Sequence, residues 1–145
     1  MVFPLNIYYP NQIQHDINKG LPFNNDFFDI IYMGQVLEHI ENASFVLKEI
    51  YRVLKSTGTL VIDVPNPYSI DRLLKYLIKR TEDLGEKSHL LFYTPGSLKR
   101  LLKFNSFRII EISTDWELNS KKYKIIPKQF RNGLGSHILL SASKL

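Results

Sequence analysis

Residues 21–66 decide the fold, and they read LPFNNDFFDIIYMGQVLEHIENASFVLKEIYRVLKSTGTLVIDVPN. Two apolar runs in this stretch, Phe28–Met33 and Leu60–Val64, have the length and composition of strands buried on both faces of a sheet. Polar or conformationally special pairs follow the runs, Gly34–Gln35 after the first and Pro65–Asn66 after the second. Because ligands bind outside the carboxyl ends of parallel strands, we expect both pairs at one binding edge.

A helix is expected between the two runs. Asn42 is a favourable N-cap, the helix should continue to about Lys55, and Gly58 is a plausible stop signal. Apolar residues recur on one face of this helix: Ala43, Val46, Leu47, Ile50 and Leu54. A strand–helix–strand unit of this length predicts a right-handed parallel crossover.

Weaker patterns indicate the remaining elements. Gln12–Ile17 is expected as a short strand, and Phe107–Ile112 and His137–Ala142 as later strands. Thr94 before Pro95 indicates a helix start, because proline is tolerated at the first helical position. Ser69 is expected to cap another helix, with a buried stripe of Ile70, Leu73, Leu74, Leu77 and Ile78.

The ordered motifs of this stretch resemble those of the class I S-adenosylmethionine (SAM)-dependent methyltransferases, closest to the small-molecule type 11 group. The matching residues are Asp16, Leu21-Pro22-Phe23, Phe28-Asp29, Leu37-Glu38-His39, Glu49, Arg52, Leu54-Lys55, Gly58 and Pro65-Asn66. A looser match continues from His89 through Pro95 toward the C-terminus.

The resemblance implies an α/β fold in a single methyltransferase-like domain over residues 1–145. It implies an incomplete Rossmann-like sheet, with strands 3/4-5-7-6 in the numbering of the family, flanking helices, and an antiparallel pair at one edge. The family begins its SAM site with a glycine-rich turn, typically G-x-G-x-G, and an acidic residue that binds the ribose. Neither is found in this sequence, so the chain is expected to lack the N-terminal glycine-rich part of the SAM site.

Four residues are implied as cofactor contacts. Asp16 corresponds to the family position that accepts a hydrogen bond from the adenine amine, and Ile17 to the residue that packs on the ring. Gly34 and Gln35 correspond to the position after strand 4 that touches SAM. From the residues alone, Asp16 is also explained as a turn residue, and Gly34 as a plain strand exit.

The acceptor side is implied to contain His39 as a general base, since histidine titrates near neutral pH. A helix-start histidine held by local hydrogen bonds is the alternative. Substrate contacts are implied for Glu38, Asn66, Tyr68, His89 and Tyr93, which could equally serve as turn or packing residues. Some relatives bind a divalent cation through E-x-x-E-H. Gln35 replaces the first glutamate here, and the loss of one carboxylate ligand predicts no metal site.

The family-level function implied is methyl transfer from SAM to a small or lipid-linked acceptor. Two alternatives remain open: a non-catalytic module that acts through protein partners, and nucleic-acid binding by the basic C-terminal half. Residues 71–145 contain 15 basic and 7 acidic residues, whereas residues 1–70 contain 4 and 7. We interpret that charge as solvated lysines on helix faces, so nucleic acid is not the expected partner.

The sequence contains no cysteine, no membrane-length apolar run and no basic segment typical of a signal peptide, which favours a cytoplasmic protein without a membrane span. In the expected strand order, Phe28–Met33 lies at the edge of the sheet without the lysine, proline or bulge that normally protects such a strand. We therefore expect the edge to be covered by Met1–Ile17, by a second copy in a homodimer, or by a partner chain.

Overall fold

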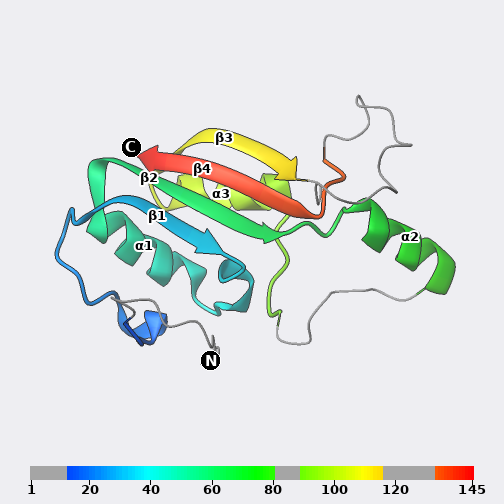
Figure 1. The fold of residues 1–145 in the computed structure, drawn as a ribbon, viewed down its shortest axis with the longest axis horizontal. Coiled ribbons are helices and arrows are strands. Elements are labelled where there is room, and N and C mark those ends of the chain that lie inside the picture. Colours follow the sequence, from blue (N-terminus) through cyan, green and yellow to red (C-terminus); the bar gives the residue numbers. More distant parts are fainter. Residues whose placement is uncertain (1–12, 81–88, 116–132) are drawn as a thin grey trace.

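A computed structural model describes residues 13–80, 89–115 and 133–145, which form one open sheet with helices (Figure 1). The elements are η1 (Ile17–Lys19), β1 (Phe28–Gly34), η2 (Leu37–His39), α1 (Ala43–Val53), β2 (Leu54–Pro65), α2 (Ile70–Lys79), α3 (Pro95–Phe104), β3 (Phe107–Asp115) and β4 (His137–Lys144), where η is a 3-10 helix. The α/β class expected from the sequence is confirmed.

The sheet has the strand order β1-β2-β4-β3. β1 pairs with β2 in parallel, and β4 pairs antiparallel with both β2 and β3. In the numbering of the family these strands are 4, 5, 7 and 6, so the expected order and its antiparallel edge pair are confirmed. The parallel register sets Gly34 opposite Asp63, and this brings the ends of β1 and β2 to one edge.

Helix α1 begins as the sequence predicts but ends earlier. The side-chain oxygen of Asn42 caps it by accepting a hydrogen bond from the Phe45 amide at 3.1 Å. The chain enters β2 immediately after Val53, so the prediction of Gly58 as a helix stop is wrong. A Cβ atom on Gly58 would lie 3.0 Å from the backbone oxygen of Asp29, which indicates that glycine here permits the close approach of β1 and β2.

One face of the sheet is buried by helices. The core residues of α1, α3 and the strands form one cluster, and α1 and α3 lie beneath the strands in Figure 1. The other face of β1 is open, since Ile30 and Tyr32 are 67% and 63% exposed. The prediction that Phe28–Met33 is buried on both faces is therefore wrong, because an apolar run specifies a strand but not the layers around it.

Helix α2 also differs from expectation. Ser69 precedes it as predicted, but its side chain makes no capping hydrogen bond, and no residue of the helix is buried. The predicted buried stripe is wrong: Leu77 and Ile78 are 63% and 79% exposed. By contrast, α3 starts at Pro95 as the Thr-Pro pair predicted. Thr94 and Ser97 form a reciprocal capping box at this start.

The predicted strand at Gln12–Ile17 is not present among the described residues. Residues 13–16 have no regular structure, and Ile17 begins η1. Asp16 caps that 3-10 helix by accepting a hydrogen bond from the Asn18 amide, and this local bond favours a turn over a strand. Within residues 13–80, 89–115 and 133–145, nothing but β2 pairs with β1. The rest of the expected cover, residues 1–12, and the basic stretch 116–132 lie outside the described residues.

None of the helices in the described part of the chain combines the length and apolar character needed to cross a bilayer.

We predict that Leu47→Ala lowers the free energy of unfolding by about 2–5 kcal/mol, because Leu47 is fully buried against the sheet and its truncation leaves a cavity. Urea denaturation measures this loss. Lys48→Ala, on the exposed face of the same helix, is the matched control and should change stability by less than about 0.5 kcal/mol. Equal effects at the two positions would contradict the packing of α1.

Candidate functional site

The segment before β1 is fixed to α1 by Arg52. Its guanidinium donates hydrogen bonds to the backbone oxygens of Leu21 (2.9 Å) and Phe23 (2.8 Å), and also to the Glu49 carboxylate (2.8 and 3.0 Å). Glu49 in turn accepts a hydrogen bond from the Leu21 amide at 2.9 Å. The E-x-x-R pair thus holds the LPF segment on the last turns of α1 and determines where β1 begins.

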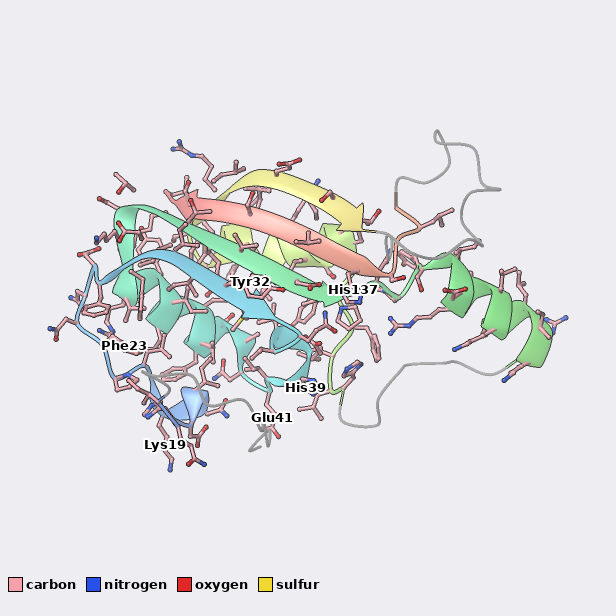
Figure 2. All side chains as sticks on the ribbon, viewed as in Figure 1. Lys19, Phe23, Tyr32, His39, Glu41 and His137 are labelled. Carbon is pink, nitrogen blue, oxygen red and sulfur yellow. The ribbon has the colours of Figure 1, made fainter. Side chains whose placement is uncertain are left out.

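Asp63 connects the ends of β1 and β2. Its carboxylate accepts hydrogen bonds from the Tyr32 hydroxyl (3.2 Å) and the Gln35 amide (3.1 Å), and lies 3.0 Å from His137 Nδ1. Figure 2 shows Tyr32 and His137 on neighbouring parts of this edge. The ring of Tyr32 lies over Gly34, where an added Cβ would come within 2.6 Å of it.

Sequence reasoning missed Asp63. The available signal was a single carboxylate inside an otherwise apolar run, one residue before Val64. Such a charge in a strand needs partners, and the parallel register supplies Gln35 from the neighbouring strand exit. Of the predicted cofactor residues, Gly34 and Gln35 therefore lie together beside this carboxylate.

Glu38, on η2, is the most unusual group of the site. The residue is only 1% exposed, and neither carboxylate oxygen has a hydrogen-bond partner within the described part of the chain. Burial raises the pKa of this carboxyl, while the neighbouring His39 and His89 oppose the rise. A buried carboxyl without hydrogen bonds costs stability, so its presence points to a chemical role.

Four of the predicted acceptor residues are brought together around this carboxyl. One ligand atom from each of Glu38, His39 and His89 lies within 4.8 Å of the others, and the two imidazole rings are 4.9 Å apart. Tyr93 is also buried, and its hydroxyl has no hydrogen-bond partner among the residues described. Burial and the nearby Glu38 charge both raise the pKa of Tyr93.

The backbone holds this group together. The Glu38 carbonyl accepts hydrogen bonds from the amides of Leu90 (2.9 Å) and Leu91 (3.1 Å), which places the 89–93 segment against η2. Two imidazoles and a carboxylate also form a donor set suited to a divalent transition metal. The expected absence of a metal therefore stays a prediction.

The other two predicted acceptor residues are placed differently. Asn66 is fully buried, and its side-chain amide donates hydrogen bonds to the carbonyls of Gly133 (2.9 Å) and Gly135 (2.7 Å). It also accepts one from the Tyr68 amide at 3.0 Å, so its polar groups hold the exit of β2 against the start of β4. Tyr68 is 52% exposed.

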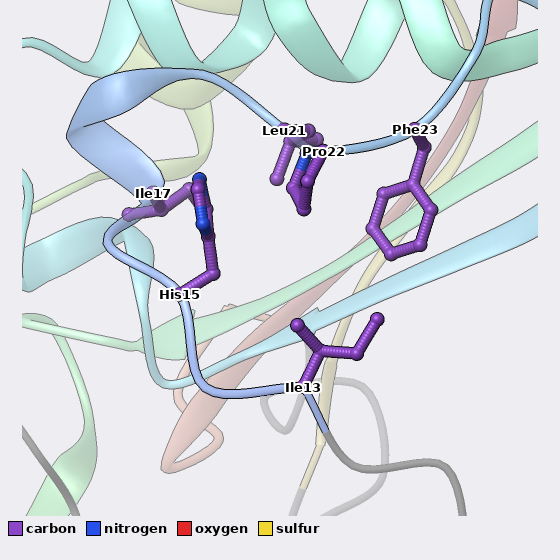
Figure 3. A pocket seen from close by; sticks show the side chains of 6 residues that line it. All are labelled: Ile13, His15, Ile17, Leu21, Pro22 and Phe23. Carbon is purple, nitrogen blue, oxygen red and sulfur yellow. The ribbon is translucent and has the colours of Figure 1, made fainter.

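Asp16 and Ile17 lie apart from Gly34 and Gln35. Figure 1 shows η1 below α1, away from the arrowhead of β1 where Gly34 lies. Hydrogen bonds from the backbone and side chain of Asn18 lower the pKa of the exposed Asp16 carboxyl. Ile17 lines an open pocket of about 220 Å³. Figure 3 shows this pocket, whose full lining is Ile13, His15, Ile17, Leu21, Pro22 and Phe23.

Comparisons with known proteins agree with this architecture. Residues 5–62 match the family model described as "Methyltransferase domain". An uncharacterized protein of Methanocaldococcus jannaschii is 29% identical over 135 residues, which cover 89% of this chain and 63% of that protein. Demethylmenaquinone methyltransferase of Lactobacillus johnsonii is 27% identical over 118 residues, which cover 70% of this chain and 48% of that enzyme. The chain thus spans about half to two thirds of the length of these relatives.

Among solved structures, a SAM-dependent methyltransferase of Archaeoglobus fulgidus superposes with a TM-score of 0.63 at 20% sequence identity. The superposition covers 91% of this chain and 66% of that protein. The fold is therefore the Rossmann-like fold of the methyltransferases. Together with the family match, it confirms the resemblance to the class I SAM-dependent methyltransferases.

We predict that Glu49 makes stability sensitive to acid. Its hydrogen bonds, first from Arg52 and then from the Leu21 amide, lower its pKa from 4.5 to about 2. Because the folded pKa is depressed, this stabilisation is complete above pH 4.5 and disappears as the pH falls toward 2. Thermal unfolding should show Glu49→Gln losing less stability over that window than the original chain. If the melting temperatures of the two proteins fell equally with pH, the proposed role of the Glu49–Arg52 pair would be contradicted.

We predict that Glu38 changes the stability of the fold with pH in the opposite direction to Glu49. Its raised pKa means that the folded state holds its proton more tightly than the unfolded state does, so this group lowers stability as the pH rises above 4.5. Glu38→Gln should therefore raise the melting temperature at neutral pH, and the gain should shrink in acid. Measurement in EDTA prevents a bound cation from contributing. A destabilised variant at neutral pH would show that the carboxylate is paired in the folded protein.

Proposed function

We propose that this chain takes part in methyl transfer from SAM to a small or lipid-linked acceptor, with His39 as the general base. The observation that supports this most strongly is the gathering of Glu38, His39 and His89 beside the exit of β1 in a methyltransferase fold. In open α/β sheets this edge is where ligands bind. An imidazole beside a buried carboxyl is suited to removing a proton from an acceptor hydroxyl as the methyl group arrives.

Methyl transfer from SAM requires little covalent chemistry from the protein. SAM is already activated by its sulfonium, and the residues need to position the acceptor in line with the methyl group and to accept a proton. Glu38 contributes a negative charge close to His39 when its carboxyl is ionised. Tyr93 is buried and lies near the Glu38 carboxyl.

A lipid-linked acceptor is favoured by one relative. The Lactobacillus johnsonii protein is named as acting on demethylmenaquinone, and it shares 27% identity with this chain over 118 residues. We propose Gly34 and Gln35 as the SAM contacts beside the acceptor group. Asp16 and Ile17 remain the proposed adenine contacts, and of the two only Ile17 lines the open pocket.

Within residues 13–80, 89–115 and 133–145, one edge of β1 has no pairing strand, and we propose that a partner completes the cofactor site there. Ile30 and Tyr32 leave an apolar surface exposed beside this edge, and an unpaired strand offers free amide and carbonyl groups. We propose that a second copy or a partner chain adds to the sheet here.

We predict that the 145-residue chain alone binds SAM weakly, with a dissociation constant nearer the millimolar than the micromolar range. The sequence supplies no glycine-rich turn or ribose carboxylate, and each missing polar contact weakens binding by about 1 kcal/mol or more. Calorimetric titration measures the affinity, and amide NMR shifts show whether Gly34 and Gln35 respond. Micromolar binding with normal turnover by the isolated chain would contradict this prediction.

In any preparation of the chain that transfers tritium from methyl-labelled SAM, His39→Asn should lower the transfer rate by about 10²–10⁴-fold, the usual contribution of a general base. Glu41→Gln is the matched control, because Glu41 lies two residues away on the exposed side (Figure 2). An unchanged transfer rate in His39→Asn would overturn the role of this histidine as a base. SAM affinity is measured on the same variant, and an unchanged affinity would show that any loss of rate comes from catalysis and not from cofactor binding.

A further inference from the structure

Helix α2 exposes an apolar stripe that the fold does not use. With successive residues about 100° apart, its aliphatic residues fall within an arc of about 140° on one side of the helix. These residues are Ile70, Leu73, Leu74, Leu77 and Ile78. Leu74, Leu77 and Ile78 are 46%, 63% and 79% exposed, so the outer part of the stripe faces away from the rest of the protein.

The opposite side of α2 is basic. Arg72, Lys75 and Lys79 lie on the helix, and Arg80 follows its last residue. Asp71 is the only acidic residue between 70 and 80, so this stretch has four basic groups against one acidic group and a net charge of +3. The helix therefore divides into an aliphatic half and a cationic half.

The start of α2 is fixed, and its remainder projects from the body. The Ile70 amide donates to the Leu134 carbonyl at 3.1 Å, and the Arg72 guanidinium donates to the Asn66 carbonyl at 3.0 Å. Figure 1 shows the helix extending beyond the end of the sheet, on the side where β2 ends. This arrangement presents the exposed turns to an outside surface.

We propose that α2 is a membrane-docking helix that lies in the surface of a bilayer containing anionic lipids. A short helix with an exposed aliphatic stripe and a lysine- and arginine-rich polar side is the type that settles at the boundary between headgroups and acyl chains. Leu74, Leu77 and Ile78 would enter that boundary, while the basic side chains meet the phosphates. This inference does not rest on the proposed function, because docking requires neither SAM nor an acceptor.

The charge distribution favours a lipid surface over a protein partner. A protein groove that buries the stripe would leave the basic groups on the opposite side in solvent, where their charge would add little to binding. A bilayer uses both halves at once, since anionic headgroups neutralise the cations while the stripe reaches the boundary with the acyl chains.

Vesicle flotation tests the proposal. The full chain should float with vesicles of equal parts phosphatidylglycerol and phosphatidylcholine, and much less with vesicles of phosphatidylcholine alone. Leu77→Glu/Ile78→Glu should lower the partition coefficient by about a hundredfold or more, because it removes two aliphatic groups and adds repulsion. Lys75→Gln/Lys79→Gln should lower it by about thirtyfold.

The matched control is Phe104→Glu/Ile110→Glu, which changes the same number of exposed apolar side chains to glutamate on α3 and β3. Phe104 and Ile110 are 81% and 59% exposed, and this variant should bind anionic vesicles as the original chain does. Since the chain has no cysteine, Leu77→Cys also provides a unique site for a bimane label. Its emission should shift to the blue on addition of anionic vesicles, whereas a label at Phe104→Cys should not shift.

Three kinds of result would overturn the proposal. The first is a flotation result, either equal flotation with neutral and anionic vesicles or an equal loss of flotation in the control and the α2 variants. The second is a bimane label at Leu77→Cys that is shielded before vesicles are added, which would show that the protein's own chain covers the stripe. The third is a dimer in size-exclusion chromatography that Leu77→Glu/Ile78→Glu dissociates, which would make a second copy the occupant.

Discussion

The contact between Arg52 and the segment leading into β1 is the constraint on which the rest of the site depends. One guanidinium, held by the Glu49 carboxylate, fixes the backbone carbonyls of Leu21 and Phe23 to the end of α1. The start of β1 then lies beside the start of β2, with Phe28 opposite Leu54. After an irregularity between Phe28 and Ile30, the parallel register continues to Gly34 opposite Asp63. Because η2 comes directly after β1, the position of Glu38 and His39 also depends on this contact.

The site combines two carboxylates with opposite surroundings. Asp63 accepts hydrogen bonds from two side chains and lies beside a third at the exits of β1 and β2, so it acts as a structural hub. Glu38 is buried without hydrogen bonds to either oxygen in the described parts of the chain, and its pKa is raised by burial. A fold tolerates such a group where the chemistry of the site requires it. The contrast is consistent with our proposal that the Glu38 cluster, and not Asp63, takes part in the chemistry at this edge.

The same edge of the sheet joins the proposed catalytic group to the proposed docking helix. Asn66 ties the exit of β2 to the start of β4, and its carbonyl holds Arg72 in the first turn of α2. A membrane surface at α2 would thus lie near the end of the strands that carry the acceptor group. For a lipid-linked acceptor, this placement would shorten the path from bilayer to site.

Local patterns in the amino-acid sequence predict the helices and strands, and the resemblance to a known family predicts their order in the sheet. The periodicity of Val46, Leu47 and Ile50 specified the buried face of α1, and Asn42 its start, because these signals act within a few residues. The motif residues Glu38, His39, His89 and Tyr93 are also recognisable in the sequence, although their proximity is not.

The cover on each face of the sheet and the contacts between distant side chains depend on the packed fold. The apolar periodicity of α2 is as clear as that of α1, yet the apolar face of α1 is buried and no residue of α2 is buried. An amphipathic pattern predicts an apolar stripe on a helix but not what packs against that stripe. The hub at Asp63 arises from strand register, and the separation of Asp16 from Gly34 arises from the path of the chain around α1. Such contacts join residues far apart in sequence, so their geometry is set by the packed sheet and not by any local pattern.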